Sequence, residues 1–347
     1  MAARLTVLAA AVALALPSGA SAVTAVLRSG HLVVDGKPFF PIMQWLQCPG
    51  SFKQQAALGI DVFLGKGCSD TSDDAELAAA ADAGVYSVLP AGSKGTGPAL
   101  LGWHFDDEPD MRGTTPAQIA AHRRTVGGKV DFLTLTSGFF SKLPPPTWTR
   151  GNRGVYRDYA RAIDLLGFDL YPLYGWCKPD WIGRVADAQR ELVSNYAGGR
   201  PTYQWIEAAS TSSQWCKGRG ITPVELRAEV WMAITNGAKG IGYFTHSWTP
   251  NYSQFRVGGD VQQEIKRTDT QIKALTPWIL GAPVPVRVES SGRVDAIAGR
   301  AGGRIYVFAV NLGFEPGTVT AHFSSPAFKP FTFDFGRLGV LVRRVYG

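Results

Sequence analysis

Two glutamates, Glu108 and Glu207, each close a short apolar and aromatic run of this sequence. The run at residues 100–105 leads into three consecutive carboxylates that end on Glu108, and Pro109, which cannot continue a strand ladder, follows at once. The run at residues 201–206 ends directly on Glu207. We therefore expect both glutamates at the C-terminal ends of parallel strands, where barrel enzymes carry their chemistry. Two carboxyl groups so placed are what acid/base-plus-nucleophile cleavage of a glycosidic bond requires.

The elements that must position these glutamates form a strand–helix alternation. Short runs rich in aromatic and β-branched residues predict eight strands buried on both faces, at 39–45, 61–64, 85–89, 101–105, 132–136, 168–171, 202–206 and 240–244. Amphipathic stretches between them predict helices at 73–83, 116–126, 180–197, 223–236 and 261–275. This pattern predicts an α/β protein with a (β/α)8 TIM barrel, in which the third helix is vestigial because about ten residues connect the third strand to the fourth.

Three segments divide the chain. Residues 1–22 combine Arg4, an apolar core and an Ala20-Ser21-Ala22 cleavage site, which predicts a secretory signal peptide. The catalytic barrel is expected over 23–275, entered through a hairpin about Asp35-Gly36. Residues 276–347 alternate with period two between Gly, Asn and Pro clusters, which predicts a small antiparallel, sandwich-like β-domain.

The net charge and the spacing of the basic residues bear on which kind of partner the protein could bind. The net charge of +7 could indicate an anionic partner, but the Arg and Lys residues occur in runs no longer than two. A solvated basic surface is therefore favoured over nucleic-acid binding. No segment after the signal is apolar enough to span a bilayer, so we expect no membrane insertion and a secreted protein.

The strand-end motifs resemble those of the retaining glycoside hydrolases of clan A over roughly residues 31–347. In that clan an acid/base glutamate ends strand four, in an Asn-Glu-Pro or Asp-Glu-Pro context, and the nucleophile ends strand seven. The resemblance implies that Glu108 is the acid/base and Glu207 the nucleophile. It also implies that Tyr171, in Phe168-Asp-Leu-Tyr-Pro172, contacts the nucleophile. Trp248 would form a sugar platform, and Gln44 with Trp45 an aromatic wall at the end of strand one.

One position departs from the clan pattern. Asp107 stands where many members carry an asparagine that donates to the sugar 2-hydroxyl, and an ionised carboxylate can only accept. Asp107 is therefore expected either to accept from a substrate hydroxyl or to be structural. The alternation of a strand would turn Asp107 away from Glu108 and place Asp106 on the face of Glu108.

Further rim residues are candidates for contact with sugar. Trp176 and Trp215 are expected in loops where an indole can stack on an apolar sugar face, and His246 lies near Trp248. Asp169, two residues before Tyr171, is interpreted as either structural or a substrate contact.

The four cysteines allow two disulfides in an exported chain. Cys48 and Cys68 follow strands one and two, and Cys177 and Cys216 follow strands six and seven. Consecutive strands of a parallel barrel are neighbours, so we expect the pairs Cys48–Cys68 and Cys177–Cys216. Their spacing resembles no zinc pattern, and we expect no metal and no organic cofactor.

The sequence thus predicts a retaining hydrolase of the β-glycosidic bonds of an extracellular oligo- or polysaccharide. A transglycosylase using the same glutamates and an inactive carbohydrate-binding barrel remain alternatives. The sugar, the linkage, exo or endo action and the oligomeric state stay open.

Overall fold

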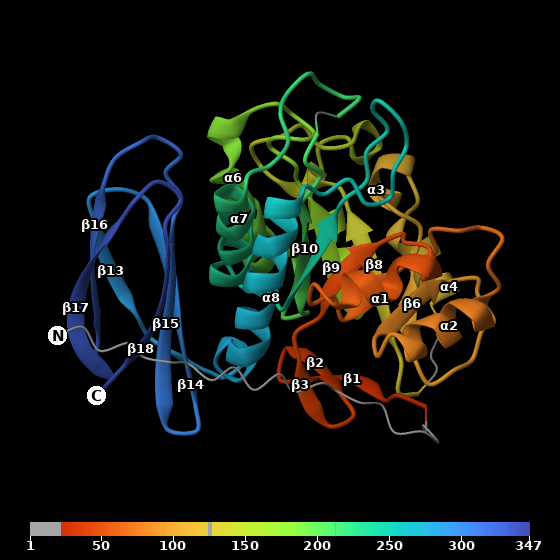
Figure 1. Ribbon diagram of the computed structural model, residues 1–347, viewed down its shortest axis with the longest axis horizontal. Helices are drawn as coiled ribbons and strands as arrows, with labels where there is room; N and C mark the ends of the chain where they lie inside the picture. Colours follow the sequence, from red (N-terminus) through yellow and green to blue (C-terminus); the bar gives the residue numbers. More distant parts are fainter. Residues whose placement is uncertain (1–21, 124–126, 212) are drawn as a thin grey trace.

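The computed structural model describes residues 22–123, 127–211 and 213–347, and the expected signal peptide therefore lies outside the described residues except for Ala22. At its centre eight parallel strands close into a barrel in the order β10-β11-β4-β5-β6-β7-β8-β9, which confirms the expected TIM barrel (Figure 1). The barrel strands are β4 (Ile42–Trp45), β5 (Val62–Leu64), β6 (Tyr86–Pro90), β7 (Leu100–His104), β8 (Val130–Leu135), β9 (Leu165–Asp169), β10 (Thr202–Glu207) and β11 (Gly240–Phe244).

All eight expected strands are present, and the sixth is displaced. It spans Leu165–Asp169 instead of 168–171, because the apolar residues after Asp169 form a loop that is itself buried. Leu170, Leu173 and Tyr174 are each only 2 % exposed in that loop. Because the loop after Asp169 is buried at the open end of the barrel, its residues are as apolar as those of a buried strand.

Helices surround the barrel: α1 (Phe52–Ala56), α2 (Asp73–Asp82), α3 (Pro109–Arg112), α4 (Pro116–His122), α5 (Val155–Ala162), α6 (Arg184–Glu191), α7 (Pro223–Thr235) and α8 (Gly259–Ile279). Helices α4 and α7 begin at the expected prolines, each after a threonine that forms a capping box. Residues 91–99, between β6 and β7, contain no helix, as expected. Helix α8 continues past residue 275, at which the sequence placed the end of the barrel. No helix in the described ranges is long and apolar enough to cross a membrane.

A small antiparallel sheet covers the N-terminal end of the barrel. It contains β1 (Ala25–Arg28), β2 (His31–Val34) and β3 (Lys37–Phe39), so the expected hairpin has an additional strand, β1. Ala25, Leu32 and Val34 pack with barrel-interior residues such as Met43 and Phe132. The interior is therefore sealed at this end, and the opposite end is left for chemistry.

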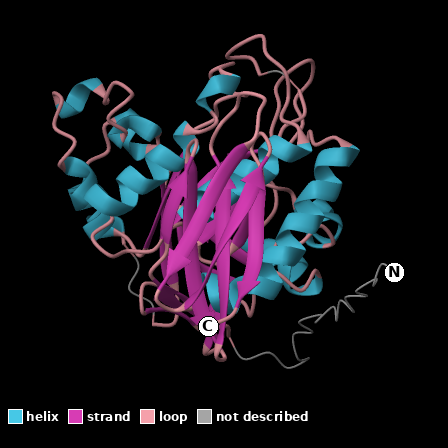
Figure 2. Cartoon of the chain, turned by 90° about the vertical axis from the view of Figure 1, so that its left-hand side faces the viewer, coloured by secondary structure: helices cyan, strands magenta, loops and turns pink. Residues whose placement is uncertain are grey.

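The C-terminal residues form two facing antiparallel sheets, as the period-two pattern predicts (Figures 1 and 2). One sheet has β12 (Ala282–Val284), β14 (Val294–Ala301), β15 (Arg304–Asn311) and β18 (Val340–Val345); the other has β13 (Arg287–Ser290), β16 (Val319–Ser325) and β17 (Phe328–Phe335). The first sheet packs on α7 and α8, where Trp231 stacks on Phe308 with ring centroids 5.5 Å apart. The β-domain and the barrel helices consequently share one apolar core.

Candidate active site

Glu108 lies at a backbone position that few non-glycine residues adopt. Strand β7 ends at His104, and Glu108 has φ 49° and ψ 52°, in the left-handed region, immediately before α3. For a residue with a side chain this conformation costs ~1–2 kcal/mol, and such positions concentrate at functional sites. Because the strand has already ended, its alternation does not extend to the carboxylates. Asp106 is exposed, and the expectation that it shares the face of Glu108 is wrong.

The carboxyl group nearest to Glu108 in its cavity belongs to Asp169, the last residue of β9. The two side chains are hydrogen-bonded to each other. Both line a cavity of about 430 Å³, whose walls include Tyr171, Trp176 and Trp215. In register Asp169 lies beside Trp205, whose indole N–H donates to Thr134 across the barrel interior at 3.0 Å. Asp169 therefore points into the mouth of the barrel.

Burial and mutual repulsion raise the pKa values of this group of acids. Desolvation raises the pKa of Glu108, and it raises the pKa of Asp169 well above its usual range, with the charge of Glu108 adding to the second effect. Desolvation and the Glu108 charge also raise the pKa of Asp107 to about 7. Asp107 lines the floor of the mouth together with Asp169. Burial thus favours the protonated forms of Glu108 and Asp169, and an acid/base site requires such a proton donor.

Glu207 ends β10 as expected, but its carboxyl group is enclosed. It is only 1 % exposed, although its register neighbour Phe244 lines the mouth. One of its oxygens accepts from the backbone N–H of Leu173 at 2.9 Å, and the other accepts from that of Tyr174 at 2.5 Å. Among the described residues, no hydrogen bond joins the Tyr171 hydroxyl to it. The loop after β9 thus covers Glu207.

Behind that loop Glu207 meets a second buried acid, Glu229 of α7. The two carboxyl groups interact directly as an acid–acid pair. Burial raises the pKa of Glu207 to about 7 and raises the pKa of Glu229 well above its usual range. The barrel therefore contains two carboxyl pairs, one open to the cavity and one enclosed behind it.

Aromatic rings extend from the mouth to the outer rim. Phe244 stacks on Tyr171 with centroids 4.9 Å apart and lies 5.5 Å from the ring of Trp45. Trp248 lies 6.2 Å from Phe244 and 6.2 Å from Trp215. Trp215 and Trp248 are 55 % and 39 % exposed, so their faces remain open to a ligand. A run of exposed ring faces suits the apolar faces of sugars.

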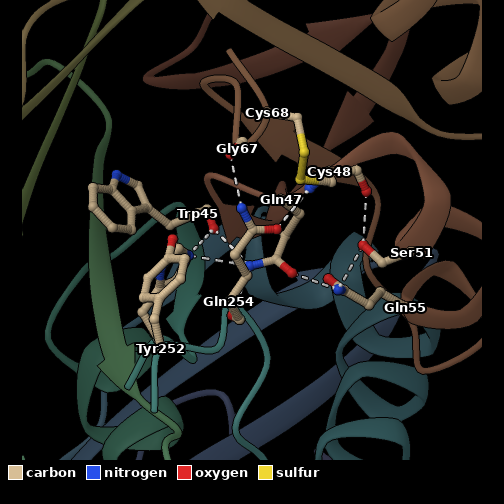
Figure 3. Close-up of a disulfide and its surroundings, with 10 residues drawn as sticks. Trp45, Gln47, Cys48, Ser51, Gln55, Gly67, Cys68, Tyr252 and Gln254 are labelled. Atoms are coloured by element: carbon tan, nitrogen blue, oxygen red, sulfur yellow. Dashed lines mark hydrogen bonds between the residues drawn. A yellow bond between two sulfur atoms is a disulfide. The ribbon is translucent and has the colours of Figure 1, made fainter. Parts of the chain in front are cut away.

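At the Trp45 end of this row of aromatic rings, a polar network lies beside the Cys48–Cys68 disulfide (Figure 3). His246 is buried, and its Nε2 lies 3.0 Å from the Trp45 carbonyl. The Gln47 amide donates to the Gln254 carbonyl at 2.9 Å, and the Gln254 side chain accepts from the Cys48 backbone N–H at 3.1 Å. His246 therefore supports the platform from behind; it does not present its ring nitrogens to the cavity.

The expected disulfides Cys48–Cys68 and Cys177–Cys216 are both present, with Cα–Cα distances of 5.1 and 6.0 Å. Each joins the loops of consecutive barrel strands.

Gln44 does not reach the mouth. It is fully buried and donates to the Thr245 hydroxyl at 2.5 Å, so it does not form the expected wall with Trp45. Sequence reasoning also missed Phe244 and the contact between Asp169 and Glu108. The predicted strand at 168–171 placed Asp169 inside a strand, so its position at the end of β9 was not visible from the sequence. Among the described residues, no group of three or more His, Cys, Asp or Glu side chains is placed to hold a metal ion.

The fold and the mouth together define a (β/α)8 barrel with paired carboxyl groups and a C-terminal β-domain. No protein-family model and no curated protein sequence matches the chain. Among solved structures it is similar to a glycoside hydrolase at 11 % identity and a TM-score of 0.52, with 92 % of this chain and 93 % of that chain covered. It is also similar to a glycoside hydrolase family 5 protein from Bacteroides vulgatus at 11 % identity and a TM-score of 0.57, with 93 % of each chain covered. The chain thus shares its fold with glycoside hydrolases over nearly its whole length.

Proposed function

We propose that the protein is a secreted glycoside hydrolase that cleaves β-glycosidic bonds of an oligo- or polysaccharide with retention of configuration. The observation that carries this proposal is the cavity of about 430 Å³, in which Glu108 meets a second carboxyl group beneath Trp176 and Trp215. Paired carboxyl groups supply the proton donor and the anion that glycosidic cleavage needs, and the indoles supply stacking surfaces. The two disulfides support an exported location.

Glu108 is the proposed acid/base. Its raised pKa keeps a proton available for the leaving oxygen, and after that transfer the carboxylate can deprotonate water. Two carboxyl groups are candidates for the nucleophile. Glu207 follows from the clan A resemblance of the sequence, whereas Asp169 shares the cavity with Glu108.

A panel of aryl β-glycosides and plant and bacterial polysaccharides tests the function. We expect the wild-type protein to hydrolyse at least one of them, and NMR of the first product should show the β-anomer. Glu108→Gln should lower kcat/KM by ~10²–10⁴-fold for substrates with poor leaving groups. For Glu108→Ala, activated aryl glycosides should still react in the first step, and azide should partly restore turnover.

Asp106→Asn is the matched control, because this exposed acid lies in the same run of carboxylates. It should retain wild-type activity. Binding of a glycan without hydrolysis of any substrate would overturn the proposal in favour of a carbohydrate-binding barrel. Transfer to a sugar acceptor in preference to water would instead indicate a transglycosylase.

A further inference from the structure

We infer that Arg337 of the C-terminal β-domain is a positioning residue for the substrate cavity. Through Glu225 and Arg219 it holds the loop that carries Trp215. The inference rests on the proposed glycosidase function, in which the ring of Trp215 is a stacking surface for sugar. It gives the β-domain a part in substrate binding, in addition to its packing against the barrel helices.

The loop between β10 and α7, residues 208–222, brings Trp215 to the cavity. Trp215 lines that cavity together with Glu108, and it is exposed. Its ring lies edge-on to Tyr174, with centroids 5.4 Å apart, and the adjacent Cys216 is bonded to Cys177. An exposed ring gains little positional order from burial. The position of Trp215 therefore depends on how its loop is fastened to the barrel.

A second fastening of this loop is Arg219, four residues after Trp215. Its guanidinium donates to both oxygens of Glu225, from Nη1 to Oε2 at 2.7 Å and from Nη2 to Oε1 at 2.5 Å. Such a bidentate contact fixes the orientation of the guanidinium as well as its distance. Glu225 lies in the first turn of α7, and its Oε2 also accepts from the backbone N–H and the hydroxyl of Thr222. The carboxylate of Glu225 thus ties the end of the loop to helix α7.

Arg337 reaches the same carboxylate from the β-domain. It lies in the turn between β17 and β18, and its Nη2 donates to Oε1 of Glu225 at 3.0 Å. Its guanidinium lies over the ring of Phe314, 4.0 Å from the centroid. The next residue, Leu338, is buried in the apolar core that the β-domain shares with the barrel helices. Arg337 is therefore held in place on its own side of the contact.

The charges explain why the grip of Arg219 depends on Arg337. The side chain of Glu225 is only 1 % exposed, and a buried carboxylate is costly unless it is paired and hydrogen-bonded. Two guanidinium groups and Thr222 together satisfy it. Without Arg337, one of its two cations is lost, and the carboxylate is free to turn away from Arg219 toward water. Both arginines are partly exposed, so solvent screens each contact and the effect of one substitution should be moderate.

The β-domain also offers a matched control. Arg293, which precedes β14, donates to Asp187 of α6 at 2.6 Å. This contact is likewise an arginine–carboxylate pair between the β-domain and a barrel helix, and Asp187 lies outside the loop 208–222. Arg293→Gln therefore removes a domain–barrel ion pair of the same type without removing a partner of that loop.

Steady-state kinetics on the polysaccharide that the wild-type protein hydrolyses tests the inference. Arg337→Gln should raise KM ~3–10-fold and leave kcat within ~2-fold, because a displaced Trp215 weakens binding and leaves Glu108 in place. Arg293→Gln should keep the wild-type KM. In a Trp215→Ala background, Arg337→Gln should change KM no further, since the ring through which it acts is gone. An equal rise in KM with and without Trp215 would overturn the inference.

Proteolysis of the native protein provides a measurement that needs no substrate. Trypsin cleaves after Lys217, an exposed residue of the same loop, and mass spectrometry follows the fragment that ends there. Arg337→Gln should speed this cleavage ~3–10-fold over wild type and Arg293→Gln, because the loop opens locally more often. Urea unfolding should give the two variants similar global stability. Equal cleavage rates in the two variants would overturn the inference. Faster cleavage of Arg337→Gln in a protein that hydrolyses no glycoside would refute the function and still support the fastening of the loop.

Discussion

Replacement of Glu229 by glutamine should change how the stability of this protein depends on pH. Glu207 and Glu229 form an acid–acid pair that is shut off from solvent, and burial raises the pKa of Glu207 from its usual 4.5 to about 7. A carboxyl group with a raised pKa binds its proton more tightly in the folded protein than in the unfolded one. Its environment therefore favours folding most below pH ~4.5, and stability is lost as the pH rises to 7.

The size of the effect follows from the same values. A rise from 4.5 to about 7 corresponds to ~3 kcal/mol of folding free energy for Glu207 alone. Glu229→Gln removes the titration of the second acid, whose pKa burial raises well above its usual range, and the amide N–H can donate to an ionised Glu207 at every pH. The variant should thus resemble the wild-type protein at pH 5 and exceed its stability by about 1–3 kcal/mol at pH 8.

Urea unfolding followed by tryptophan fluorescence, with the disulfides intact, measures this difference at both pH values. Comparison with the wild type removes the contribution of other acids. Glu289→Gln, on the exposed β13, is the control and should show equal differences at pH 5 and pH 8. The reasoning is refuted if Glu229→Gln also changes stability equally at the two pH values, because the pair would then not titrate between them.

Three other perturbations have defined outcomes. Asp107→Asn removes a negative charge that raises the pKa of Asp169; the limb of the kcat/KM profile that reports the titration of Asp169 should move to lower pH, and an unmoved profile contradicts the coupling. Trp248→Ala should lower kcat/KM at least ~10-fold while the melting temperature stays nearly constant, because the side chain is 39 % exposed; unchanged kinetics would make the ring structural. Trp231→Ala should cost ~3–5 kcal/mol in urea unfolding, because this buried indole stacks on Phe308 between the barrel and the β-domain. A loss below ~1 kcal/mol would mean that the interface repacks.

The barrel was predictable because its strands are buried on both faces and its helices carry strong start signals. Thr115 and Thr222, each followed by proline, form the capping boxes at which α4 and α7 begin. The displaced end of β9 shows where this reasoning stops. A loop buried by the barrel mouth has the apolar composition of a strand, and local pattern cannot distinguish the two.

The candidate site was predictable as a set of strand ends and less so as a set of contacts. The sequence by itself determined that Glu108 follows strand four, that Glu207 ends strand seven, and that the cysteines pair between consecutive loops. These properties depend on chain order, because neighbouring strands of a parallel barrel follow one another along the chain.

Only the tertiary structure decided which carboxyl groups meet. The left-handed backbone at Glu108 turns its side chain toward Asp169, and the loop carrying Leu173 and Tyr174 covers Glu207 and leaves it paired with Glu229. The alternation of a strand sets the direction of a side chain only for residues within the hydrogen-bonded part of the strand. Beyond the last ladder residue, direction depends on loop conformation and on partners far away in the chain, which no local spacing encodes.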